Sequence, residues 1–170
     1  DLGVAMSRAP EDETADKPTD IQLWVFDQTG EKVFYKALNE TSLSVSNGFI
    51  TIAEQEIPIK ANVKDLHFHV VLNSQNAAFT PTLDENTSES SIQGATFTSL
   101  HTNLTDNQVP MYGYAVKENI SLNNRYAISI DATRAVGKLD LYFTKTSADT
   151  YLKINSIKLE HVPEKGYLAS

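Results

Sequence analysis

The chain has no cysteine among its 170 residues, and it has only one tryptophan and two methionines. The absence of cysteine excludes disulfide bonds, thiolate nucleophiles, zinc–thiolate sites and iron–sulfur ligation. Basic residues are few, since 14 Lys and Arg stand against 22 Asp and Glu, for a formal net charge of −8. Because an acidic chain repels phosphate backbones and anionic lipids, we expect no nucleic-acid partner and no binding to a membrane surface.

Long apolar runs are also missing. No stretch approaches the ~18 apolar residues that a membrane-spanning helix needs, and no signal-peptide pattern is present. The chain begins with Asp1 rather than a methionine, so we expect that a preceding segment has been removed. A chain of this length is typical of one domain with a sizeable hydrophobic core.

The motifs of common enzymes are absent as well. The chain has no G-x-S-x-G nucleophile elbow, no P-loop, no G-x-G-x-x-G fingerprint and no EF-hand calcium loop. Its carboxylates are scattered, apart from an acidic run at 11–13 inside a polar segment. We therefore expect no catalysis, no cofactor and no resident metal.

What the chain does have is a series of short β-type segments, rich in β-branched and aromatic residues and separated by turn residues. The expected strands cover 21–26, 32–38, 49–52, 56–60, 66–72, 111–116, 120–122, 126–131, 138–143 and 152–161. Residues 73–108 form a long polar insertion, in which Ser90 and Gln93 have the spacing of a capping box that opens a short helix. Short strands with almost no helical period predict an antiparallel β-sandwich.

The first twenty residues divide into two parts. Leu2, Val4 and Met6 alternate with small residues, which predicts a short strand. Residues 7–20 are polar and acidic and contain two prolines, which indicates an exposed linker.

Arginine is rare in this chain, and its three positions differ in context. Arg8 lies in the expected linker, whereas Arg125 and Arg134 lie in or beside expected strands. Because proteolysis needs local chain freedom, an arginine-specific protease would find its easiest target at Arg8. The alternative is that Arg8 is an ordinary linker residue.

Two groups of side chains are candidates for a binding site. His67 and His69 lie two residues apart on an expected strand and so share one face, which is one way to supply two zinc ligands. The alternative is a half-exposed strand face, since the spacing supplies no third ligand. Tyr112 and Tyr114 share a face in the same way, and together with Trp24 they could stack on a sugar ring or pack inside a sandwich.

Four motifs occur in an order and spacing that resemble those of a known family. Ser-Arg-Ala at 7–9 precedes the acidic linker, and IQLWVFDQTG follows at 21–30. Further on come VPMYG at 109–113 and RAVGKLDL at 134–141, with Gly137 where the family usually has Ala. This pattern is similar to that of the fimbrillins, the type V pilus subunits of Bacteroidales, over the length of one family domain.

The resemblance implies a transthyretin-like antiparallel β-sandwich and a structural role. Fimbrillins are exported as lipoprotein precursors to the outer membrane of a Gram-negative bacterium and are trimmed by an arginine-specific protease. Trimming removes the first strand, and a strand from another subunit fills the opened groove and builds the fimbria. Carried over to this chain, Arg8 and Ala9 flank the cut, and Leu2, Val4 and Met6 belong to the removable first strand.

We therefore expect a structural subunit of a cell-surface fimbria, or pilus. Its partners would be other fimbrial subunits, the arginine-specific protease, and a host glycan or protein. A surface carbohydrate-binding adhesin on the same sandwich, using Tyr112, Tyr114 and Trp24, is the first alternative. A periplasmic metalloenzyme using His67 and His69 is the second.

The expected domain plan has three parts. Residues 1–20 hold the first strand and the protease-sensitive linker, and residues 21–165 form the β-sandwich. Residues 166–170 begin a linker to a C-terminal domain.

Overall fold

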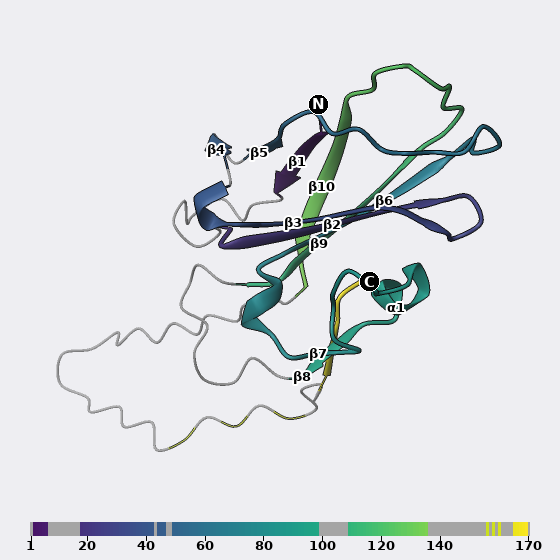
Figure 1. Ribbon diagram of the computed structural model, residues 1–170. Helices are drawn as coiled ribbons and strands as arrows, with labels where there is room; N and C mark the ends of the chain where they lie inside the picture. The colour runs from purple at the N-terminus through teal and green to yellow at the C-terminus, as the bar shows by residue number, and fades with distance from the viewer. Residues whose placement is uncertain are drawn as a thin grey trace.

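The computed structural model is an all-β sandwich with very little helix (Figure 1). It describes residues 2–6, 18–42, 44–46, 49–98, 109–135 and 165–169, together with the single positions 156, 158 and 160. Two sheets, one large and one small, are formed by these residues.

Four antiparallel strands form one half of the large sheet. In spatial order they are β3 (Lys32–Asn39), β2 (Asp20–Asp27), β6 (Leu66–Leu72) and β9 (Met111–Lys117). β2 and β6 lie in the middle and are rich in valine, isoleucine, leucine and aromatic residues, which suits strands with two covered faces.

The other half of the large sheet continues from β9. Its strands, in spatial order, are β10 (Ile128–Arg134), β1 (Leu2–Met6), β5 (Phe49–Ile52) and β4 (Ser44–Ser46). β1 pairs parallel to β10 and antiparallel to β5. Ile50 and Ile52 of β5 share a core with Ile21 and Leu23 of β2, although four strands lie between β2 and β5 in the sheet. The sheet therefore folds over, and its two halves form the layers of the sandwich.

A small antiparallel sheet packs on the opposite face of β2 and β6. Its strands are β7 (Phe79–Thr80), β8 (Thr96–Thr98) and β11 (Lys165–Tyr167), and the short helix α1 (Glu89–Gln93) connects β7 to β8. The 3-10 turns are η1 (Glu40–Ser42) and η2 (Ser74–Asn76). Within the described part of the chain, no helix has the length and apolarity that crossing a membrane requires.

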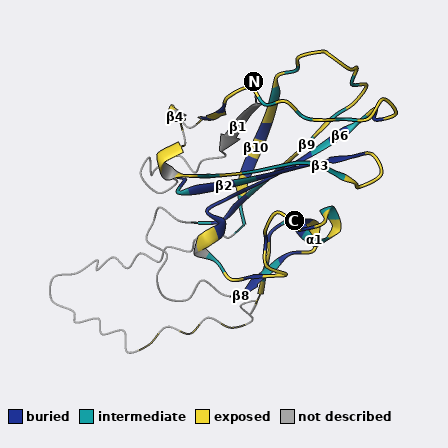
Figure 2. Ribbon diagram, viewed as in Figure 1, coloured by how far each residue is buried: buried dark blue, intermediate teal, exposed yellow. Residues whose placement is uncertain are grey.

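β2 and β6 are buried on both faces, and each face has its own core (Figure 2). Alternate residues of a strand point to opposite faces, so Leu23 and Trp24 belong to different cores. The inner core comprises Ile21, Leu23, Val25, Ile50, Ile52, Val63, Leu66, Phe68, Val70, Leu72, Met111, Ile130 and Ala132. The outer core comprises Trp24, Phe26, Val71, Phe79, Leu83, Ile92, Ala95, Phe97 and Leu168.

The structure confirms the sandwich and corrects two expected strands. Residues 56–60 alternate between half-buried and exposed as a strand does, but they pair with none of the described strands, and Pro58 has no amide hydrogen to donate. Residues 120–122 lie in the connection from β9 to β10, which turns at Asn119 and Asn123 with positive φ angles of 55° and 63°. The expected strands at 138–143 and 152–161 lie outside the described segments, except at three single positions.

The polar insertion holds more structure than the sequence predicts. The helix is present, but its N-cap is Ser88 rather than Ser90, and the Ser88 hydroxyl accepts a hydrogen bond from the Ser91 amide at 3.2 Å. β7 and β8 flank it and were not expected. The insertion therefore supplies most of the small sheet.

The end of the chain, where a linker is expected at 166–170, pairs with β8. Gly166 pairs with Phe97 of β8, and the Leu168 amide donates to the Ala95 carbonyl at 3.0 Å. A Cβ atom at Gly166 would lie 2.4 Å from the Phe97 ring, so this close approach requires glycine. Residues 165–168 thus belong to the folded unit, while the rest of the expected domain plan stays a prediction.

Candidate functional site

β1 lies inside the large sheet rather than at its edge (Figure 1). Leu2 is in register with Ile128 of β10 on one side and with Ile52 of β5 on the other. The pairing with β10 continues to Met6. We call the space between β10 and β5 the β1 slot. A strand in this slot pairs with two rows of backbone donors and acceptors, and both rows would lose their partner without it.

The walls of the β1 slot are apolar on the side of the inner core. Ile130 and Ala132 of β10, and Ile50 and Ile52 of β5, are all buried there. Behind β10, a Cβ atom at Gly113 of β9 would lie 2.6 Å from the Ile130 side chain. Glycine at this position therefore lets β9 and β10 approach closely enough to hold the wall in place.

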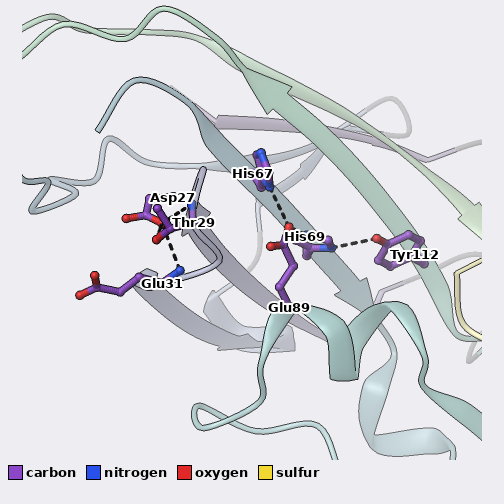
Figure 3. Close-up of polar contacts among 7 residues, drawn as sticks. All are labelled: Asp27, Thr29, Glu31, His67, His69, Glu89 and Tyr112. Atoms are coloured by element: carbon purple, nitrogen blue, oxygen red, sulfur yellow. Dashed lines mark hydrogen bonds and ion pairs between the residues drawn. The ribbon is translucent and has the colours of Figure 1, made fainter. Parts of the chain in front are cut away.

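A polar cluster on the outer face connects β6 and β9 to α1 (Figure 3). Nδ1 of His67 lies 2.8 Å from Oε1 of Glu89, and Nε2 of His69 lies 3.0 Å from the same oxygen. Nδ1 of His69 lies 2.8 Å from the hydroxyl of Tyr112. We call His67, His69, Glu89 and Tyr112 the histidine cluster. Glu89 is the first residue of α1, which connects two strands of the small sheet. The cluster therefore joins the small sheet and its helix to the large sheet.

Burial sets the protonation states in the histidine cluster. His69 has no exposed surface, and this burial lowers its pKa further than the Glu89 carboxylate raises it, so the ring is neutral at pH 7. A neutral imidazole has one donor and one acceptor, and a carboxylate only accepts. Nε2–H of His69 therefore donates to Glu89, and Nδ1 accepts from the hydroxyl of Tyr112.

Two further pKa shifts agree with this assignment. Burial raises the pKa of Tyr112, which keeps its hydroxyl protonated and able to donate. Partial burial alone would raise the pKa of Glu89, but the hydrogen bonds from His69 and His67 outweigh it and lower that pKa. Glu89 is therefore ionised at neutral pH.

The turn from β2 to β3 lies beside the histidine cluster (Figure 3). One carboxylate oxygen of Asp27 accepts hydrogen bonds from the amides of Thr29 and Glu31 at 2.8 and 3.1 Å. Gly30 has a φ of 80°, which glycine adopts without strain. The second Glu89 oxygen would lie 3.6 Å from a Cβ atom at Gly30, so the turn and α1 are neighbours.

His67 and His69 do share a strand face, as their spacing predicts, but the Glu89 carboxylate lies against both. Within the described segments, no group of three or more His, Asp or Glu residues is arranged to hold a metal ion. The ring nitrogens nearest Glu89 instead hold α1 against β6. This arrangement is a structural contact between the large sheet and the helix of the small sheet.

The aromatic residues expected to stack on a sugar do not form one exposed platform. Trp24 is 0% exposed, and its Nε1 donates to the Asp84 carbonyl at 2.8 Å in the outer core, so its assignment to a glycan surface is wrong. The Tyr112 hydroxyl is bonded to His69, and Tyr114 packs on the same ring at 4.7 Å between centroids. Tyr112 thus belongs to the histidine cluster, and Tyr114 packs against it.

An open cavity of about 780 Å³ adjoins the β1 slot, and we call it the cleft. Apolar side chains such as Leu23 and Phe68 line it from the layer opposite β1. Residues 54–57, which follow β5, and residues 120–126, which precede β10, line it from the sides. The cleft therefore has apolar side chains on its floor, while polar side chains make up about half of its lining.

The structure describes some of the residues expected to take part in processing and leaves out others. Leu2, Val4 and Met6 lie in β1, as the alternation predicts. Arg8 and Ala9 lie outside the described residues. Arg125 lies on the connection from β9 to β10 with its side chain 87% exposed, so this arginine is also accessible to a protease.

Glu89 and the cleft were missed by the sequence analysis. The capped turn after Ser88 gave a local signal for a helix, but Glu89 meets His69 across 20 positions of sequence. The alternation of 56–60 gave a signal for a strand, but it could not show that none of the strands described in the structure pairs with it.

Comparison with solved structures shows which class of proteins has this fold. A fimbrial assembly protein from Parabacteroides distasonis superposes with a TM-score of 0.51 at 12% identity, over 79% of this chain and 52% of that one. Two candidate cell adhesion proteins from the same species superpose with TM-scores of 0.51 and 0.50, at 15% and 18% identity. Each covers 79% of this chain, and this chain covers 40% and 45% of them.

The chain thus shares the β-sandwich fold of fimbrial and cell adhesion proteins. It spans about half the length of these proteins or less. No family model matches the sequence, and no curated protein matches it either. The relationship is therefore one of fold.

Proposed function

We propose that this chain is a domain of a fimbrial structural subunit that assembles by strand exchange at the β1 slot. In this proposal the subunit is exported as a lipoprotein precursor, and an arginine-specific protease cuts it after Arg8 at the outer membrane. β1 then leaves the slot, and a strand from another subunit takes its place. The subunit acts at the cell surface as a building block, without catalysis.

The position of β1 is the observation that supports this proposal most. β1 is the first strand of the chain, yet it lies between two other strands of the sheet. A single cut after it would free it without breaking the chain between any other strands. The vacated slot would present two rows of unpaired backbone groups beside buried Ile50 and Ile130, which favours the addition of a new strand. The shared fold with a fimbrial assembly protein agrees with this role.

Limited digestion with an arginine-specific protease tests the proposal. Because Arg125 is exposed, the Arg125→Lys variant is the substrate of choice, and Arg8→Lys in the same background is the matched uncut control. We expect mass spectrometry to show a first cut after Arg8. The product should then release residues 1–8 and associate on size-exclusion chromatography, while the control stays monomeric. A trimmed product that stays monomeric and stable, and binds no added strand peptide, would contradict the proposal.

A further inference from the structure

The Arg125 side chain is exposed, but exposure of a side chain is not sufficient for cleavage. Its ion pair with Glu54, at 3.0 Å between Nε and Oε1, lies on the surface and contributes little stability. A protease, however, binds the residues on both sides of the cut bond as an extended segment, which requires a chain that is open or that opens locally. When opening is fast, the rate of cleavage follows the fraction of molecules in the open form. The conformation of the chain around Arg125 therefore decides how fast the bond after it is cut.

The residues before Arg125 do not have the extended conformation that a protease binds. Asn119 and Asn123 have positive φ angles of 55° and 63°, whereas an extended segment needs negative φ angles. Asn123 precedes Arg125 by only two positions. Its backbone must therefore change conformation before the segment fits an active site.

Tyr126, on the other side of the bond, is held by the same loop. Its hydroxyl oxygen accepts hydrogen bonds from the Ser121 amide at 2.9 Å and from Nδ2 of Asn124 at 3.4 Å. Nζ of Lys117 lies 4.9 Å from the centre of the Tyr126 ring, which is a cation–π contact. We call Lys117, Ser121, Asn124 and Tyr126 the tyrosine lock. Because the lock spans Arg125, binding of this segment in an extended form would break it.

The start of the loop is held by the body of the sandwich. The Asn119 amide donates to Oδ1 of Asp65 at 3.1 Å, and the Ile120 amide donates to the Lys64 carbonyl at 2.8 Å. The side chain of Ile120 also packs against the inner core. Opening of the loop therefore costs several contacts, which makes the open form rare.

We propose that the loop at 118–127 protects the bond after Arg125 from arginine-specific proteases by its folded conformation, and thereby directs processing to Arg8. The protection follows from the contacts of the loop, and only its consequence for Arg8 rests on the proposed function. A cut after Arg125 would break the chain between β9 and β10, which are neighbours in the large sheet. A cut after Arg8 leaves every strand from β2 onward in one chain.

Rates of cleavage after Arg125 test this protection. The Arg8→Lys protein is digested with an arginine-specific protease, and the products are followed by mass spectrometry. The reference is an unfolded peptide of residues 119–130, digested at the same concentration. We expect the bond after Arg125 to be cut about 100-fold more slowly in the protein than in the peptide, or slower still. Equal rates would overturn the proposal.

Tyr126→Phe shows whether the tyrosine lock provides the protection. It removes the accepting hydroxyl and keeps the ring, and we expect cleavage after Arg125 to accelerate about three- to tenfold. The peptide with the same change controls for the preference of the protease itself. Arg134 is the internal control for global unfolding, because the Ala135 amide beyond it donates to the Pro110 carbonyl at 2.9 Å. Unchanged cleavage after Arg125, or an equal acceleration after Arg134, would contradict the proposal.

A pair of variants at Asn123 tests the turn of the backbone. Asn123→Ala disfavours the positive φ angle, whereas Asn123→Gly adopts it without strain. Relative to the corresponding peptides, we expect the alanine variant to be cut after Arg125 about three- to tenfold faster than the glycine variant. The reverse order would show that the turn gives no protection.

Digestion of the wild-type protein separates this inference from the proposed function. A first cut after Arg8, with the bond after Arg125 intact, supports both. If the bond after Arg125 is cut as fast as the bond after Arg8, the protection is wrong and the proposed trimming stands. If neither bond is cut, the protection stands and the proposed trimming is wrong.

Discussion

The two faces of β2 and β6 are closed in different ways. The outer core is covered by the continuous stretch from β7 to β8 and by β11, and directional hydrogen bonds of the histidine cluster hold α1 in one position. The inner core is covered by β10, β1 and β5, and beside them lies an open cleft. Backbone pairing and apolar contacts can come from any alternating strand, whereas a buried polar network accepts one set of partners. The strand exchange that we propose therefore concerns the inner face.

The hydrogen bonding of buried polar side chains agrees with this contrast between the two faces. Among the residues described here, no buried side-chain nitrogen or oxygen atom lacks a hydrogen-bond partner. The histidine cluster is thus a completed contact. The experiments below separate the two faces, from the largest expected effect to the smallest.

Removing the largest side chain of the outer core should have the greatest effect. Trp24→Ala deletes a fully buried ring and its hydrogen bond to the Asp84 carbonyl. We expect the free energy of unfolding, measured in urea, to fall by about 3–5 kcal/mol. Phe49→Ala, at a side chain that is mostly exposed, is the control and should change it by less than about 0.5 kcal/mol. Equal losses for the two variants would mean that the outer core is not closed as described.

A truncation in the wall of the β1 slot should act on β1 itself. Ile130→Ala removes a buried side chain of β10, and we expect a loss of about 2–4 kcal/mol. Hydrogen exchange at the amides of residues 2–6 should accelerate more in this variant than in Trp24→Ala. If Trp24→Ala accelerated it equally, the two faces would not be independent.

Loss of the central carboxylate should weaken the contact between the two modules. Glu89→Ala leaves donors of His67 and His69 without their acceptor, and we expect a loss of about 1–3 kcal/mol. Glu85→Ala, at an exposed residue of the same insertion, is the charge-matched control. Thermal unfolding of both variants provides the measurement, and a loss shared by Glu85→Ala would point to net charge instead.

Deleting one hydroxyl should have a smaller effect. Tyr112→Phe keeps the ring but removes the donor to Nδ1 of His69, and we expect a loss of about 0.5–1.5 kcal/mol. Tyr114→Phe is the matched control, because it makes the same change on the exposed neighbour of the same strand face. The two variants should therefore differ in urea midpoint, and identical midpoints would show that the hydrogen bond between Tyr112 and His69 does not stabilise the fold.

The pH dependence of stability should be smallest near neutrality and should grow toward acid. The folded-state pKa of His69 is below its ordinary value of 6.5, so the unfolded chain binds a proton that the folded chain does not. Stability should therefore fall as the pH drops below about 6.5. The lowered pKa of Glu89 acts in the same direction below its ordinary value of 4.5.

Urea midpoints between pH 7 and pH 5 check this sign. His69→Gln removes the titrating ring and should flatten the dependence over that range. A dependence that is the same in wild type and in His69→Gln would contradict the lowered pKa of His69.

Much of the strand layout could be predicted from the sequence. β6 and β5 have the bounds that their alternation predicts, at 66–72 and 49–52. The helix was expected within two residues of its start. These features depend on neighbours in sequence, so local patterns are sufficient to find them.

The candidate site was less accessible to prediction. The spacing of His67 and His69 showed a shared face, but not that Glu89 would lie against it. Residues 56–60 showed the alternation of a strand, but not that they would pair with none of the strands that the structure describes. Each of these depends on a segment distant in sequence.

The sequence by itself determined a cysteine-free, acidic chain of short alternating strands that must bury apolar faces in layers, because alternation and composition are local properties. Only the tertiary structure decided that the first strand lies between β10 and β5, that the polar insertion covers the second face, and that residues 54–57 and 120–126 line one cleft. Strand neighbours are chosen by the path of the whole chain, and a strand's own residues do not specify which edges it will meet.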